Sequence, residues 1–144
     1  MKHLELLQQY LANSAVLNIK MHNIHWNVVG LQFINIHNFT EDFYDKLFAD
    51  LDEVAELLKM KNVMPLSTMA EYLEKSAIQE IEAKDFGIKE SLEIIQKDMN
   101  VMKSLATDIR NLADEEGDFE TVALFEDYVA YYSKNLWFVD SMMK

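Results

Sequence analysis

The chain has 144 residues, and half of them are hydrophobic, which is enough for one domain with a substantial core. Its formal net charge of −12 repels nucleic acids and anionic membranes and attracts cations, although solubility alone would also explain it. Because there is no cysteine, disulfides and thiolate metal sites are excluded. No apolar run resembles a signal peptide or a membrane span, so we expect a soluble, cytoplasmic protein with no membrane partner.

Apolar residues recur at three- and four-residue spacing almost throughout, which predicts long amphipathic helices. Only three glycines and one proline occur, so turns should be few. Gly30 offers a stop for the first helix, and Asp118 is a suitable N-cap for the last. Thr68 and Glu71 form a capping box for a short helix that ends near Lys75. The four apolar stripes cover residues 4–28, 36–58, 88–112 and 122–136.

Four long helices of similar length are typical of a four-helix bundle. The first and last connections are short, so the helices that they join should be antiparallel. Residues 62–86 are enough to cross the bundle, which is the connectivity of ferritin-like bundles rather than of simple up-and-down ones. We therefore expect an all-α protein, a single ferritin-like four-helix domain over residues 1–144, with a short extra helix in the crossover.

Two polar pairs share one face of the second helix. His37 and Glu41 are four residues apart, and so are Asp52 and Glu56. From Glu41 to Asp52 the helix makes three turns plus about 20°, so all four residues fall in a sector roughly 100° wide. That sector lies about 160–180° from Phe43, which belongs to the apolar stripe. These side chains should therefore point away from the bundle core.

Two interpretations of this outward face remain open at this point. A charge pattern of this kind usually marks a solvated helix face. Phe48 and Ala55 lie among the carboxylates, however, and an aromatic residue there favours burial against another surface. The chain has no Glu-x-x-His motif, so a ferritin-type di-iron site inside one chain is not expected.

The spacing of the polar pairs predicts a dimer as the smallest functional unit. Glu41 and Asp52 are about 16 Å apart along the helix axis, which is too far for both to bind one metal ion. Two antiparallel copies of this helix, related by a two-fold axis, would solve the problem. The axis would bring His37 and Glu41 of one chain opposite Asp52 and Glu56 of the other, giving two equal sites.

Other residues near the first turn are candidates for the same site. His25 lies at a similar distance from the Gly30 turn as His37 and would add a ligand, although it also fits a core histidine. Trp26 fits packing alone, or donation of an electron beside an iron site. His22 and His3 have weaker claims as ligands.

Together these residues resemble the Dps family, the ferritin-like mini-ferritins named for DNA protection in starved bacterial cells. The resemblance covers essentially the whole chain. Its more specific part is the pattern His25-Trp26-Asn27, Gly30, Phe33, His37, Glu41, Asp52 and Ala55-Glu56. A second match, similar to the family's last helix, is Gly117-Asp118-x-x-Thr121 with Leu124, Lys134 and Trp137-Phe138.

The resemblance implies a hollow dodecamer built from two-fold dimers, with ferroxidase sites at the two-fold interfaces. His25, His37 and Glu41 would come from one subunit, and Asp52 and Glu56 from its mate. Such proteins oxidise Fe(II), preferably with hydrogen peroxide rather than dioxygen, and store ferric mineral, which limits oxidative stress. Iron (Fe2+/Fe3+) is then the expected metal. The alternative is a non-catalytic helical assembly in which the same residues bind structural zinc.

The sequence departs from the family pattern in three ways. Glu41 stands where Asp is usual, and its longer side chain should shift the weaker iron position. Leu57 stands where Arg is common, which removes an expected ion pair beside the site. There is no lysine-rich N-terminal tail, so with this net charge DNA binding is not expected. Glu116, Asp118 and Glu120 lie where the family's three-fold openings form, but we interpret Asp118 as a helix cap and assign none of them a firm pore role.

Overall fold

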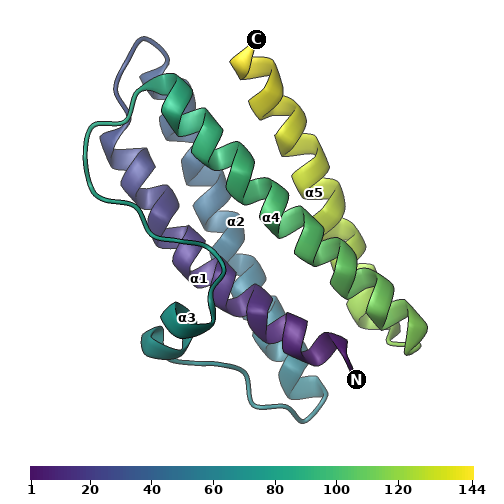
Figure 1. Cartoon of the computed structure of the whole chain (residues 1–144). Helices are drawn as coiled ribbons and strands as arrows, with labels where there is room; N and C mark the ends of the chain where they lie inside the picture. Colours follow the sequence, from purple (N-terminus) through teal and green to yellow (C-terminus); the bar gives the residue numbers. More distant parts are fainter.

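The computed structural model describes residues 1–144 and contains five helices and no sheet. They are α1 (His3–Asn27), α2 (Phe33–Met60), α3 (Met69–Lys75), α4 (Ile88–Glu115) and α5 (Phe119–Met143). Figure 1 shows α1 beside α2 and α4 beside α5, each pair antiparallel, with both termini at the ends of the bundle. The predicted all-α, ferritin-like bundle with a short helix in its crossover is confirmed. No helix combines the length and the apolar character that crossing a bilayer needs.

The core lies between the four long helices and is rich in aromatic rings. The Tyr10 and Tyr128 rings stack with their centroids 5.5 Å apart, and Phe125 packs edge-on against both. The Tyr10 and Tyr132 hydroxyls are 2.8 Å apart, so the buried oxygens satisfy each other. Burying a side chain of this size contributes about 1.5–3 kcal/mol. The core therefore fixes the registers of α1 and α5.

The crossover between α2 and α4 is held along α1 by amide side chains. Asn13 Oδ1 accepts from the Ala77 backbone N–H at 2.8 Å, and Asn23 Nδ2 donates to the Ile81 carbonyl at 3.1 Å. Gln9 donates to the Lys75 carbonyl at 2.8 Å. The extended segment thus finds these hydrogen-bond partners on α1, and at its end Phe86 pairs with the backbone around Val28 in a single β-bridge. The predicted capping box is confirmed: Thr68 and Glu71 bond reciprocally at the start of α3.

Asp118 begins α5, as predicted, but its side chain does not cap the helix. The carboxylate is buried and accepts from His3 Nε2 at 2.8 Å, from Lys61 Nζ at 2.7 Å and from the Thr121 hydroxyl at 2.7 Å. The predicted helix start at Asp118 is therefore confirmed, but the prediction that its side chain caps the helix was wrong. Asp118 instead joins the start of α1, the end of α2 and the start of α5. Glu120, which is exposed, also contacts Lys61 at 3.1 Å.

Candidate metal centre

The turn between α1 and α2 brings two of the predicted histidines together. His25 lies in the last turn of α1, and His37 lies near the start of α2. Between them Gly30 has φ +131°, a conformation that side chains rarely adopt. The reversal is tight enough for the two imidazole rings to stack, with their centroids 3.6 Å apart.

Reciprocal hydrogen bonds set the protonation of both rings. His25 Nδ1 lies 2.7 Å from the His37 backbone oxygen, and His37 Nδ1 lies 2.8 Å from the His25 backbone oxygen. A carbonyl oxygen only accepts, so both Nδ1 atoms must carry the proton. In the neutral rings the lone pair is then on Nε2, the arrangement that a metal-binding histidine needs.

Two neighbours that the sequence did not single out fix the His25 ring. The Thr40 hydroxyl lies 3.2 Å from His25 Nδ1, and the Tyr44 ring stands edge-on to the imidazole at 5.2 Å. Burial lowers the pKa of His25 and outweighs the hydrogen bond to the His37 carbonyl, which acts in the opposite direction. The net shift favours the neutral ring. The role of Thr40 could have been predicted from the sequence, because Thr40 follows His37 by three residues on the same helix. At that spacing a threonine hydroxyl can reach a backbone carbonyl.

The carboxylates Glu41, Asp52 and Glu56 are exposed on the outward face of α2. The opposite face of that helix carries buried apolar residues, including Phe43. The expectation that these side chains point away from the core is therefore confirmed. Phe48, between the two acidic groups along the helix, leaves 52% of its surface exposed.

One chain does not complete a metal site. No group of three histidine, cysteine, aspartate or glutamate side chains lies close enough to hold a metal ion. The candidate ligands form two separate groups, which we call half-sets. His25 and His37 make up one half-set near the α1–α2 turn, and Asp52 and Glu56 make up the other farther along α2. Glu41 follows His37 by one helical turn and so lies on the histidine side.

The other candidates lie in different surroundings. Trp26 is exposed, and its ring centroid is 5.4 Å from that of His22. His22 Nδ1 bonds the Asn18 carbonyl at 2.8 Å, and its ring stacks on that of Tyr44 with the centroids 3.6 Å apart. Leu57 belongs to the buried core, so this position faces the bundle interior.

The chain is similar to known proteins in both sequence and fold. The family model of the ferritin-like domain matches residues 4–144. The DNA protection during starvation protein of Helicobacter pylori is 33% identical over 142 residues, covering 98% of each chain. The structure of antigen TpF1 from Treponema pallidum superposes with a TM-score of 0.97 at 30% identity, covering 99% of this chain and 92% of that one.

A third neighbour carries the description of the superfamily. It is a Dps protein from Vibrio cholerae, described as a member of a broad superfamily of ferritin-like diiron-carboxylate proteins. Its TM-score is 0.93 at 28% identity, covering 99% of this chain and 89% of that one. The whole length of the chain therefore matches in both sequence and fold, and the protein belongs to the Dps family of ferritin-like proteins.

Proposed function

We propose that the protein is a ferroxidase that oxidises Fe(II) at sites shared between two subunits and stores the ferric product inside an oligomeric shell. The observation that carries this proposal is the reciprocal bonding of His25 and His37. It directs two Nε2 lone pairs to a ligand while the carboxylates needed to complete a site lie elsewhere on the surface. Imidazole and carboxylate are ligand types that suit iron.

The half-sets would meet across a two-fold axis. His25, His37 and Glu41 of one subunit would face Asp52 and Glu56 of its mate, and the symmetry would make two equal sites per dimer. The exposed Phe48 would then be buried between the two copies of α2. By analogy with the family, six such dimers would close a dodecameric shell of roughly 200 kDa, given a chain of 16.8 kDa.

The residues of this chain would bind Fe(II) and hold it in place while it is oxidised. Two ferrous ions would each give up one electron to hydrogen peroxide, which takes up two protons and becomes two molecules of water. Dioxygen is the alternative oxidant. The negative charges of the chain would attract Fe(II) to the shell, and the neutral His25 ring would bind without first losing a proton. Where a site holds only one ferrous ion, Trp26, exposed beside His22, is a candidate donor of the second electron that hydrogen peroxide needs.

Anaerobic loading with Fe(II), followed by hydrogen peroxide, tests the proposal. The wild-type protein should oxidise iron rapidly, as followed by the ferric absorbance. The double variant Asp52→Ala plus Glu56→Ala should lose about 100-fold or more in initial rate, because mutating even the residues that only support metal ligands typically costs about 10–100-fold. Retention of the wild-type rate by the variant would refute the site. The matched control is Asp42→Ala, whose exposed carboxylate follows Glu41 on the same helix and makes no ion pair or side-chain hydrogen bond.

A second candidate is an assembly that binds structural zinc with the same ligands, because imidazole and carboxylate also bind Zn²⁺. Zinc has no redox chemistry, so this protein would bind the metal and oxidise nothing. The same iron assay therefore separates the two functions.

DNA binding is not expected, despite the name of the Helicobacter pylori relative. With 25 acidic against 13 basic residues, the chain would repel the phosphate backbone. A gel mobility shift with linear duplex DNA at physiological salt should show free DNA at micromolar protein concentrations. A retarded band that weakens steeply with added salt would contradict this expectation.

A further inference from the structure

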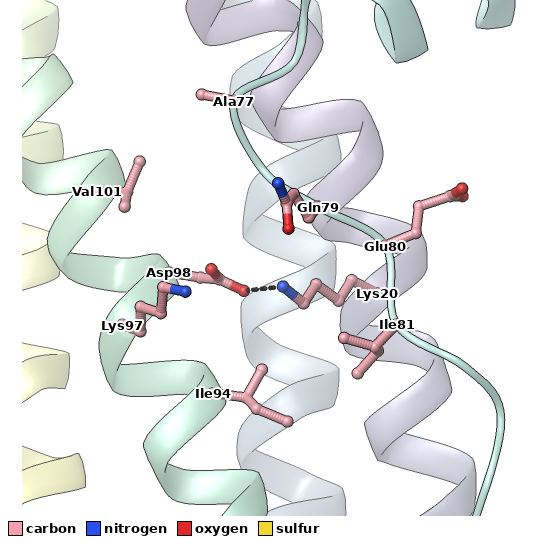
Figure 2. Close-up of a pocket in the computed structure, with 9 residues that line it drawn as sticks. All are labelled: Lys20, Ala77, Gln79, Glu80, Ile81, Ile94, Lys97, Asp98 and Val101. Atoms are coloured by element: carbon pink, nitrogen blue, oxygen red, sulfur yellow. Dashed lines mark ion pairs between the residues drawn. The ribbon is translucent and has the colours of Figure 1, made fainter.

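Four buried side-chain atoms have no hydrogen-bond partner, and one of them is a nitrogen. The three oxygens are Ser14 Oγ, Asn18 Oδ1 and Asp98 Oδ2, and the last lies 2.7 Å from Lys20 Nζ in an ion pair (Figure 2). The nitrogen is Nδ1 of His3, whose side chain is completely buried at the start of α1. Because buried polar atoms are nearly always bonded, this nitrogen points to a partner from outside the chain.

The bond to Asp118 fixes which ring nitrogen of His3 carries the proton. Nε2 lies 2.8 Å from Asp118 Oδ2, and the same carboxylate also accepts from Lys61 and Thr121. An ionised carboxylate only accepts, so Nε2 must carry the proton, and in the neutral ring the lone pair is then on Nδ1. A histidine that binds a metal ion with one nitrogen typically donates from the other to a carboxylate.

The backbone nitrogens beside this ring are also without partners in the helix. The first N–H groups of a helix have no carbonyl to bond within it, and α1 begins at His3. Lys2 has ψ −33°, which turns its own nitrogen and that of His3 to the same side of the chain. These two nitrogens can close a five-membered chelate ring on a metal ion, and His3 Nδ1 adds a six-membered ring. Three adjacent nitrogens are therefore available as ligands.

The nitrogen of Met1 would be the fourth ligand. In the 144-residue chain it is an amine, two residues before His3, and both Met1 and Lys2 are exposed to solvent at one end of the bundle (Figure 1). The Met1 carbonyl is held only by a long bond of 3.4 Å from the Leu4 N–H, so the first residue can turn towards an ion at little cost. Four nitrogens in one plane are typical of Cu(II) and Ni(II) sites.

The charges of such a site balance. Binding displaces one proton from the amine and one from each of the two backbone nitrogens, because metal ligands bind in their deprotonated form. The two negative backbone nitrogens then cancel the two positive charges of the metal ion. The ammonium of Lys61, which bonds Asp118, therefore faces no added net charge.

We propose that residues 1–3 bind one Cu(II) or Ni(II) ion through the backbone nitrogens of Met1, Lys2 and His3 and through His3 Nδ1. Asp118 orients the ring through its bond to Nε2. This site shares no residue with the candidate iron centre and uses nitrogen donors alone. Its failure would leave the proposed ferroxidase activity untouched, and the reverse also holds.

Electron paramagnetic resonance of the assembled 144-residue protein with one equivalent of Cu(II) per chain tests this proposal. At neutral pH the spectrum should show square-planar copper with four nitrogen donors. Copper at the candidate iron centre would instead have imidazole and carboxylate ligands, and so a mixture of nitrogen and oxygen donors. A spectrum dominated by that mixture, or no bound copper, would refute the site.

Variants of the first residues provide the second arm. One glycine added before Met1 turns the amine into a backbone amide and leaves the bond between His3 and Asp118 in place. This chain should bind Cu(II) at the site about 100-fold or more weakly, because the loss of groups that only support ligands already costs about 10–100-fold. His3→Gln should lose the four-nitrogen spectrum, and circular dichroism would check its fold.

His22→Gln is the matched control, because His22 is on the same helix and its Nδ1 bonds the Asn18 carbonyl. It should keep the four-nitrogen spectrum. If the glycine-extended chain binds copper as tightly as the wild type with that spectrum, or if His22→Gln loses it, the proposal is wrong. The glycine-extended chain keeps every side chain of the protein, so its result decides the matter even where His3→Gln fails to fold.

Discussion

At the scale of single residues, the candidate site depends on backbone carbonyls as much as on side chains. Each of His25 and His37 donates its Nδ1 proton to the backbone of the other, so the same turn sets both tautomers. The spacing in the sequence indicated which histidines would meet. It could not indicate which nitrogen stays free, because that depends on the exact approach of two helices.

Asp118 is a second residue whose contacts could not be predicted from the sequence. The sequence placed it correctly at the start of a helix, but its partner His3 is 115 residues away along the chain. No local pattern contains that contact. Three helix ends meet at this one carboxylate, so its environment is a property of the folded bundle.

The pKa of Asp118 leads to a prediction about stability. Burial by itself would raise the pKa, but hydrogen bonds from Lys61, Thr121 and His3 outweigh it and hold the value at about 2, below the ordinary 3.8. The folded pKa is lower than the unfolded one, so this stabilisation is full above about pH 4 and is lost as the pH falls through about 2. Asp118→Asn should therefore lower the free energy of unfolding by about 2 kcal/mol at pH 7.

Denaturant titrations at several pH values check this prediction. The difference between wild type and Asp118→Asn should stay constant from pH 7 to about pH 4 and shrink only below that. Glu120→Gln is the control, because this exposed carboxylate also pairs with Lys61 and should change stability by no more than about 1 kcal/mol. Equal effects of the two variants would contradict the central role of Asp118.

At the scale of elements, the helices follow from local pattern and the crossover does not. Apolar spacing and a few stop signals were enough to predict four long helices and the capped α3. The course of residues 62–86 depends instead on amides of α1, such as Asn13 and Asn23, bonding to backbone groups far along the chain. Side chains of this type are also common on solvated helix faces, so the sequence gives no sign of which ones bind the crossover.

The α1–α2 turn gives a prediction at this scale. A Cβ on Gly30 would lie 2.8 Å from Ile88 Cγ1, and its φ of +131° is strained for any other residue. Gly30→Ala should therefore destabilise the protein by roughly 1–3 kcal/mol and slow iron oxidation, because the histidine rings would move apart. Thermal unfolding and the iron assay measure both effects.

Gly87→Ala is the matched control, since a Cβ there meets nothing within 4 Å. It should change stability by no more than about 0.5 kcal/mol. Replacing Ile88 by alanine in the Gly30→Ala background should recover the part of the loss caused by the close contact. If Gly30→Ala is as stable as the wild type, the tight turn is not what holds the two histidines.

At the scale of the whole molecule, one chain leaves apolar surface that another copy would cover. Trp26, Leu31, Ile34 and Phe48 are all exposed around the α1–α2 turn and the outward face of α2. The same region carries both half-sets of candidate ligands. The sequence predicted this division from the distance between Glu41 and Asp52 alone, because helix geometry converts spacing into length. The identity of the mate's ligands stays a prediction.

Complementation between two inactive variants tests the shared site most directly. One chain would carry His25→Ala and His37→Ala, and the other Asp52→Ala and Glu56→Ala. In a mixed dimer, the histidines of the second chain would face the carboxylates of the first, which makes one intact site. If co-expressed chains pair at random, about half of the dimers are mixed, so about a quarter of the sites should regain iron oxidation. Shells of each variant prepared separately and then combined should stay inactive. If the co-expressed shells oxidise iron no faster than either variant alone, the site is not shared between subunits.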